Sequence, residues 1–230
     1  MKLSYRLQTV ASFADRGCSV ADIGTDHGYI PIWLTEEGIA DHAIAMDVGK
    51  GPLERATEHI RKHGLEEKIE TRLSDGVAKL EPGEADTVIV AGMGGELVMK
   101  ILDEGRHVWD SVKNWILSPQ SEIGRVRHYL ADQGFVIVGE TMVMDEGKYY
   151  TVMKVQRGVM DYEKEAYYQY GKLPAEQKNP VLRQFLEKEK KQTVQILAQV
   201  KTQDTEASLV RRGELEQELG WIEEIEHEMQ

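Results

Sequence analysis

Short apolar runs alternate with amphipathic segments through the first two thirds of the chain. The runs are apolar at nearly every position rather than at every second one, which is typical of strands that are covered on both faces of a parallel sheet. We predict such strands at 19–23, 42–46, 69–73, 86–91 and 114–118. The segments between them carry apolar residues at helical spacing, and glycine ends two of them at Gly64 and Gly134. Repeated strand–helix units predict a doubly wound α/β sheet with right-handed crossovers.

The end of this region departs from the pattern. Two β-rich runs, 135–142 and 149–155, are separated by the glycine-containing segment 145–148. Such a spacing predicts a β-hairpin. The sheet is therefore expected to finish with an antiparallel pair instead of another parallel strand.

Strand signals stop after Arg157, and two long helical patterns follow. One apolar stripe runs between Pro180 and about Asp204, and a second runs to the end of the chain; a turn at 201–205 separates them. The first stripe comprises Leu182, Phe185, Leu186, Ile196, Leu197 and Val200, and the second comprises Leu215, Leu219, Ile222, Ile225 and Met229. Facing stripes predict an antiparallel helical hairpin or short coiled coil, either as a packing appendage or as a dimerisation arm. We therefore expect two domains, 1–157 and 158–230.

Composition narrows the range of functions. The 28 Lys and Arg against 40 Asp and Glu give a net charge of −12, so any nucleic-acid contact must come from basic residues gathered on one surface. No apolar stretch approaches the ~20 residues that span a bilayer, and the first ten residues do not resemble a secretory signal. The single cysteine, Cys18, fits a reducing compartment. We expect a cytoplasmic protein with no membrane partner and, since no ligand spacing is present, no metal site.

The strongest local motif follows the first predicted strand. The segment from Asp22 to Gly28 leads from a strand through two glycines into a helix. Gly24 and Gly28 would allow a ligand to approach the backbone closely, and this position is where nucleotide-like ligands bind to parallel sheets. An ordinary strand–helix turn would have the same spacing.

The next three strands end in the same manner. Asp47 ends the second strand, where a carboxylate can accept hydrogen bonds from ribose hydroxyls. Asp75 and Gly76 follow the third, and Ala91-Gly92-Met93-Gly94-Gly95-Glu96 follows the fourth. Each could be a helix cap or a solvated loop on its own. Together on one sheet edge they favour an adenosine-type ligand.

The charge of the motif distinguishes two such ligands. A dinucleotide pyrophosphate requires a G-x-G-x-x-G loop whose amides surround negative charge. Here Asp22 precedes the loop and Asp26 lies inside it, so pyrophosphate would be repelled. S-adenosylmethionine (SAM) carries a sulfonium and an ammonium group, which carboxylates attract. The motif therefore favours SAM.

With these residues the chain resembles the class I SAM-dependent methyltransferases, and more closely the bacterial tRNA (adenine-22-N1)-methyltransferase family. The resemblance rests on Leu7–Ala11, Asp22–Pro31 and Ala91–Glu96, and it covers essentially the full length. It implies a Rossmann-like class I sheet with an antiparallel terminal hairpin and a C-terminal helical, coiled-coil-like domain. The Asn/Asp-Pro-Pro-Tyr motif of many amino-methyltransferases is missing after the fourth strand, which suits transfer to a ring nitrogen.

The resemblance also implies roles for individual residues. Asp22, Gly24 and Gly28 would line the methionine part of SAM, Asp47 the ribose, and Asp75 and Gly76 the adenine. Thr25 and Val48 would also bind the cofactor. Ala91, Gly92 and Met93 would form the floor beside the sulfonium. Asp26 and Tyr29 would lie at the methyl-transfer face as catalytic residues.

These two catalytic candidates have structural alternatives. A carboxylate at Asp26 could orient the target base through its exocyclic N6 and stabilise the positive charge formed on the ring, or it could cap the following helix. Tyr29 could stack on the base or pack under the loop. His27 could transfer a proton, but a histidine satisfied within the turn is the simpler interpretation.

Substrate contacts are expected outside the glycine motif. Gln120 follows the fifth strand on the same edge and could touch the target base, or belong to a plain loop. Contacts to tRNA are assigned to Arg6, Lys188 and Lys191, with further candidates at Lys2, Arg16, Lys190, Lys201, Arg211 and Arg212; each could instead be solvated. We expect a monomer, although the stripes of the tail could also pair between chains. Rival functions are methylation of another RNA, a protein or a small molecule, and a non-enzymatic interaction protein that uses the helical hairpin.

Overall fold

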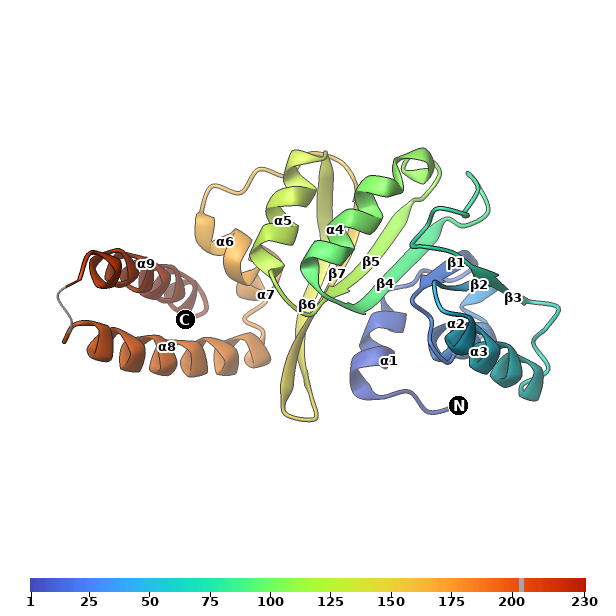
Figure 1. Cartoon of the computed structure of the whole chain (residues 1–230), viewed down its shortest axis with the longest axis horizontal. Coiled ribbons are helices and arrows are strands. Elements are labelled where there is room, and N and C mark those ends of the chain that lie inside the picture. The colour runs from blue at the N-terminus through green and yellow to red at the C-terminus, as the bar shows by residue number, and fades with distance from the viewer. Residues whose placement is uncertain (203–204) are drawn as a thin grey trace. The chain divides into compact units, whose positions relative to one another are not determined.

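A computed structural model of the chain describes residues 1–202 and 205–230 (Figure 1). The chain divides into two compact units, Met1–Met160 and Asp161–Gln230. Residues 203–204 of the predicted interhelical turn lie outside the described residues.

The first unit is built on a seven-stranded sheet in the order β3-β2-β1-β4-β5-β7-β6. The predicted strands are confirmed with small changes at their ends: β1 Cys18–Ile23, β2 Ala40–Asp47, β3 Ile69–Leu73, β4 Thr87–Met93 and β5 Asn114–Pro119. These five strands run parallel. Strand order reverses beside β1, because β2 lies on one side of it and β4 on the other.

The predicted hairpin is formed by β6 (Phe135–Asp145) and β7 (Lys148–Arg157). β7 is inserted between β5 and β6 and is antiparallel to both, so β7 alone opposes the direction of the other strands. Glu146 and Gly147 connect the pair, with φ of 48° and 75°. Positive φ at both central residues matches the twist of a two-residue hairpin. The arrangement is the Rossmann-like class I methyltransferase sheet that the sequence predicts.

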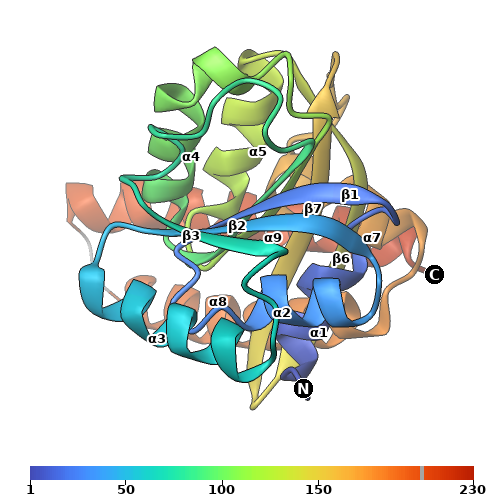
Figure 2. The same cartoon turned by 90° about the vertical axis from the view of Figure 1, so that its right-hand side faces the viewer.

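Helices cover both faces of this sheet (Figure 2). On one face lie α1 (Tyr5–Ser12), α2 (Tyr29–Glu36) and α3 (Lys50–Lys62); on the other lie α4 (Gly95–Glu104) and α5 (Ile123–Asp132). A 3₁₀ turn, η1 (Arg106–Val108), follows α4. Coverage on both faces explains why the strands are continuously apolar.

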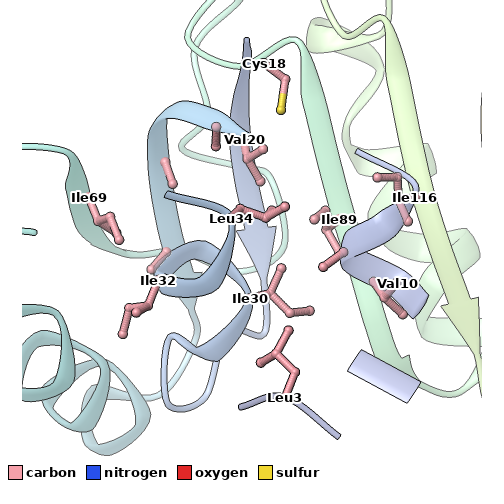
Figure 3. Close-up of a cluster of buried hydrophobic side chains, with 14 of the residues drawn as sticks. Leu3, Val10, Cys18, Val20, Ile30, Ile32, Leu34, Ile69, Ile89 and Ile116 are labelled. Carbon is pink, nitrogen blue, oxygen red and sulfur yellow. The ribbon is translucent and has the colours of Figure 1, made fainter. Parts of the chain in front are cut away.

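The core beneath α1–α3 is made from side chains of two layers (Figure 3). Ile30, Ile32 and Leu34 of α2 meet Val20 of β1 and Ile89 of β4, all at most 5% exposed. Cys18 is buried at the edge of this cluster and has no disulfide partner. It acts as a small apolar side chain, and burial raises the pKa of its thiol to about 11.

In the described part of the second unit, all regular elements are helices. It contains α6 (Glu165–Tyr170), α7 (Lys172–Glu176), α8 (Pro180–Val200) and α9 (Glu206–Glu228). Ion pairs join Lys190 to Glu226 and Lys201 to Glu216, so residue numbers rise along α8 as they fall along α9. The long helices are therefore antiparallel, as predicted; supercoiling of the pair stays a prediction.

The prediction that Ile196 belongs to the inward-facing stripe of α8 is wrong. Ile196 is 42% exposed, whereas Leu197 beside it is 8% exposed and packs inward. Adjacent helical residues differ by about 100° in direction, so both cannot face α9. Thr193 takes the inward position one turn earlier, and its hydroxyl contacts Glu218 at 3.1 Å.

Within the described residues, no helix is long and apolar enough to cross a membrane.

A buried ion pair connects α5 to β6. The Arg127 side chain (1% exposed) donates from Nη2 to Oε1 of Glu140 (0% exposed) at 2.7 Å. Neither charge can be solvated by water, so each depends on its partner.

We expect Glu140→Leu to lower the free energy of unfolding by about 3–5 kcal/mol, because it leaves the Arg127 guanidinium buried beside an apolar side chain. The double variant Arg127→Met/Glu140→Leu should recover most of that loss. Urea unfolding followed by tryptophan fluorescence measures both. Equal losses in the single and double variants would contradict this account.

Candidate active site

The carboxyl ends of β1 to β5 meet along one edge of the sheet. Both N–H groups that follow β1 donate to the carbonyl oxygen of Met46, at 2.8 and 3.0 Å. The first N–H after β3 donates to Asp47 at 2.9 Å, and the N–H of Gln120 donates to Met93 at 2.8 Å. These bonds join the strand ends into one surface, which we call the rim and define as residues 22–28, 47–48, 74–76, 91–94 and 118–120.

Glycine is required at the centre of the rim. Gly24 has a φ of 72°, and a Cβ on it would overlap the terminal methyl of Met93. That methyl is the end of a flexible side chain, so the Met93 side chain would have to move to make room for a Cβ on Gly24. Gly28 has a φ of 71°, but a Cβ there would lie 3.4 Å from that of Ala56, an ordinary contact. The need for glycine at position 28 is one of conformation.

Two carboxylates lie close together at this centre. Asp22 is 3% exposed, and burial raises the pKa of its carboxyl to about 6, with a further contribution from the neighbouring charge of Asp47. Among the described residues, Asp22 has no basic partner. The Oδ1 atom of Asp47 accepts a hydrogen bond from the N–H of Gly49 at 2.8 Å. A buried carboxylate without a cation is suited to a positively charged ligand, so the residues present fit the ammonium and sulfonium groups of SAM.

The turn between Gly24 and Gly28 presents polar side chains outward. Asp26 has a φ of 48°, and its carboxylate is 60% exposed. Its Oδ1 atom accepts a hydrogen bond from Nη2 of Arg55 at 2.8 Å. Capping of the following helix, the alternative role expected for Asp26, is wrong. The N-cap residue of α2 is Gly28, and no side chain makes a capping hydrogen bond there.

Aromatic rings gather beside this turn. The rings of His27 and Tyr29 are stacked, with centroids 5.1 Å apart and planes 12° apart. His59 of α3 lies against both, at 5.4 Å from His27 and 5.7 Å from Tyr29. Tyr29 remains 37% exposed, so one face of the group is open to a substrate.

Two predicted substrate residues meet at Gly92. A Cβ on Gly92 would lie 3.4 Å from Nη1 of Arg6 and 3.8 Å from Nε2 of Gln120. Nη1 of Arg6 is buried and has no hydrogen-bond partner in the described part of the chain. The guanidinium lies over the Tyr150 ring at 5.1 Å, and the backbone N–H of Arg6 donates to Asp145 at 3.0 Å. The terminal hairpin thus places an unpaired donor at the rim.

The remaining predicted cofactor residues follow the same edge. Val48 is 70% exposed beyond Asp47. The Asp75 carboxylate is 63% exposed, 3.9 Å from the amino group of Lys100. Gly76 has a φ of 51°, and the Thr25 side chain is buried. Ala91 is half-buried where β4 approaches the rim.

The other predicted tRNA contacts lie on the second unit. Lys188 and Lys191 are exposed on α8. Lys190 between them pairs with Glu223 and Glu226, and Lys201 and Arg211 pair with acidic residues of α9. In the described part of the chain, no group of three or more His, Cys, Asp or Glu side chains could hold a metal ion.

Sequence reasoning missed several residues at this site, above all Arg55, His59 and Tyr150. Arg55 lies 29 positions from Asp26, and Tyr150 lies far from Arg6 in the chain. Spacing within a motif cannot find such partners. The one available signal was that Arg55 and His59 are four residues apart and so share a face of α3.

Comparisons with known proteins identify the family of the chain. A family model described as a methyltransferase domain matches residues 3–153. The tRNA (adenine(22)-N(1))-methyltransferase of Bacillus subtilis is 32% identical over 98% of this chain and 97% of its own. A putative tRNA (m1A22) methyltransferase of Streptococcus pneumoniae superposes with a TM-score of 0.91 at 35% identity, covering 97% of this chain and 99% of that one. Its complex with S-adenosyl-L-methionine gives a TM-score of 0.88 at 33% identity, with the same coverage.

Strand order, the glycine-rich rim and the matched domain together define a class I SAM-dependent methyltransferase. Within that class, the chain belongs to the family of the tRNA (adenine(22)-N(1))-methyltransferases.

The contact of Gly24 with Met93 gives a test of the rim. We expect Gly24→Ala to cost about 1–2 kcal/mol of stability, because alanine is strained at positive φ. It should also weaken binding of S-adenosylhomocysteine more than about tenfold, equivalent to 1.4 kcal/mol, by displacing the Met93 side chain on the rim. Gly38→Ala is the matched control, since Gly38 has a φ of 63° with nothing within 4 Å. Urea unfolding and calorimetric titration distinguish the two effects; equal binding in both variants would refute the role of the contact.

Proposed function

We propose that this protein transfers the methyl group of SAM to N1 of the adenine at nucleotide 22 of tRNA. The observation that carries the proposal is the rim, where a buried carboxylate without a basic partner, a glycine turn in contact with Met93 and an exposed Asp26 lie together in a chain of this family. When bound, SAM supplies an electrophilic methyl group. The Asp22 side chain would hold its cationic methionine part, Asp47 its ribose, and Asp75 with Gly76 its adenine.

Transfer to N1 requires positioning more than activation. N1 of adenine has an in-plane lone pair, so it attacks the methyl carbon without losing a proton first. The new N–C bond makes the ring cationic as the C–S bond breaks, and N6 then releases a proton to water. In this proposal the Asp26 carboxylate accepts a hydrogen bond from N6, orients the base and stabilises the positive charge, while Tyr29 stacks on the base.

Donors near Gly92 would hold the nucleotide. Nη1 of Arg6 and Nε2 of Gln120 converge on Gly92, where Arg6 has an unused donor. A base in folded tRNA must leave its stack to reach such a site, and this requires contacts elsewhere on the tRNA. We assign these contacts to the second unit, through Lys188 and Lys191 among others.

The remaining parts of the proposal concern assembly and location. The apolar stripes of α8 and α9 pack against one another within one chain, which supports a monomer. We propose that it acts in the cytoplasm, where its tRNA substrate is found. Residues 1–157 would carry the chemistry and residues 158–230 would contact tRNA.

The function is tested with purified protein, SAM and two tRNA transcripts that differ only at nucleotide 22. We expect 1-methyladenosine in the transcript with A22 and none in the transcript with G22, because guanine N1 carries a hydrogen. Nucleoside mass spectrometry measures the product. Methylation of a protein or small-molecule acceptor without methylation of tRNA would reject the proposal, as would methylation of both transcripts.

The pKa of Asp22 predicts how cofactor binding depends on pH. Because this pKa is about 6 in the free protein, the carboxyl is protonated at pH 5 and must lose that proton to pair with an ammonium group. We expect affinity for S-adenosylhomocysteine to fall about tenfold from pH 7 to pH 5, because the deprotonated fraction of Asp22 falls by about that factor across its pKa. Calorimetric titration across this range measures it.

Stability of the free protein should change in the opposite direction. An unfolded aspartate titrates near 3.8, so between about pH 4 and 6 the folded chain binds more protons than the unfolded chain. The contribution of Asp22 to stability therefore falls as pH rises through this window. Two variants test the source of the pH dependence of binding. Asp22→Asn should bind S-adenosylhomocysteine weakly, with an affinity that depends little on pH. Asp41→Asn, an exposed change at the other end of β2, should match the wild type. If the affinity of Asp22→Asn still varied with pH as that of the wild type does, Asp22 would be excluded as the source.

A further inference from the structure

The turn that carries Asp26 does not fix the direction of its side chain. The N–H of Gly28 donates to the carbonyl oxygen of Thr25 at 2.9 Å, which closes the turn. The Asp26 side chain is 60% exposed, so packing does not restrict its rotamers. An exposed carboxylate that must meet one atom of a substrate therefore needs partners that hold it.

Arg55 of α3 is such a partner. Its Nη2 atom donates to Oδ1 of Asp26 at 2.8 Å. The other oxygen, Oδ2, lies 3.5 Å from Nε2 of His27. The guanidinium thus occupies one oxygen and leaves lone pairs of the carboxylate for another donor.

His59, one helical turn after Arg55, contacts the next residue of the turn. Its Nδ1 atom lies 3.1 Å from the carbonyl oxygen of His27; a carbonyl only accepts, so Nδ1 carries the hydrogen and donates. The His59 ring also stacks on the His27 ring, 5.4 Å between centroids. Backbone and ring of His27 are therefore both held by α3.

Packing fixes α3 close to this turn. Ala56, between the two side chains, is fully buried, and a Cβ on Gly28 would lie 3.4 Å from its methyl. Residues 55 and 59 are four apart and lie on the same face of the helix. Both side chains consequently extend from a rigid element, which is the arrangement that holds reactive groups most accurately.

We propose that Arg55 and His59 are positioning residues: together they hold the Asp26–His27 turn so that the Asp26 carboxylate points to N6 of the target adenine. This rests on the proposed function of Asp26. An exposed ion pair contributes little to stability, so the pair acts on orientation. A displacement of about 1 Å at a reacting group can cost up to about 100-fold in rate.

The first experiment measures steady-state methylation of A22 tRNA by Arg55→Ala. We expect kcat to fall about tenfold, with KM for tRNA within about twofold and unchanged affinity for S-adenosylhomocysteine. Arg61→Ala is the matched control, because it removes the same charge from the same helix; the Arg61 side chain faces a surface hollow lined by Lys50 and Leu73. It should behave as the wild type. A rise in KM with unchanged kcat would overturn the proposal, since Arg55 would then bind tRNA directly.

The decisive experiment combines Arg55→Ala with Asp26→Asn. If Arg55 acts through Asp26, the double variant has the kcat of Asp26→Asn alone. Multiplied losses would overturn the proposal. Wild-type activity in the same assay separates the two hypotheses: an inactive wild type rejects the proposed function, whereas an active wild type with an equally active Arg55→Ala variant rejects only the positioning role.

His59→Phe tests the second half of the proposal, because phenylalanine keeps the ring stack and removes the Nδ1 donor. We expect a smaller loss of kcat than in Arg55→Ala, absent when Asp26→Asn is also present. Recovery in His59→Asn, which restores a donor near the Nδ1 position, would support the carbonyl hydrogen bond. A loss that persists in the Asp26→Asn background would overturn the role of His59.

Discussion

The Asp22 carboxylate is withdrawn from water at the end of a buried strand, and the surrounding rim is arranged around that constraint. A buried carboxylate without a cation is costly, as its raised pKa shows. The rim nevertheless places Asp47 near it instead of a lysine or arginine. The fold therefore carries a buried negative charge that a cationic ligand would stabilise. Above this pKa the buried Asp22 carboxylate lowers the stability of the free protein.

Much of the fold could be predicted from the sequence because its signals are local. Strands buried on both faces are apolar at each position, and Gly64 and Gly134 end their helices with positive φ, so element boundaries differ by a few residues at most. The stripe on α9 was also predicted, since its residues repeat regularly. The short helices α6 and α7 were missed because neither is long enough to show a helical period.

The residues of the candidate site also differ in whether a local signal in the sequence could reveal them. Asp22, Gly24 and Asp47 follow from the rule that parallel strands bring their carboxyl ends to one edge. Arg55, His59 and Tyr150 could not be found in this way, because their partners are brought near only by the packing of α3 and of the terminal hairpin. Ile196 shows where a helical pattern is insufficient. Ile196 and Leu197 are both apolar, and the packing of α8 against α9 decides which of them faces inward.

The hairpin of β6 and β7 reaches beyond the sheet to which it belongs. β5 pairs with β7 only at Val155, Lys154 and Met153, while β6 and β7 continue as a two-stranded ribbon to the Glu146–Gly147 turn (Figure 1). Such a ribbon is marginally stable by itself, and α1 supports it through Arg6, which bonds Asp145 and covers Tyr150. Two segments almost 140 residues apart in the chain thus order one another. The amino-terminal helix therefore stabilises the ribbon, and the position of the Arg6 guanidinium beside Gly92 depends on the turn of the hairpin, which follows the carboxyl end of β6.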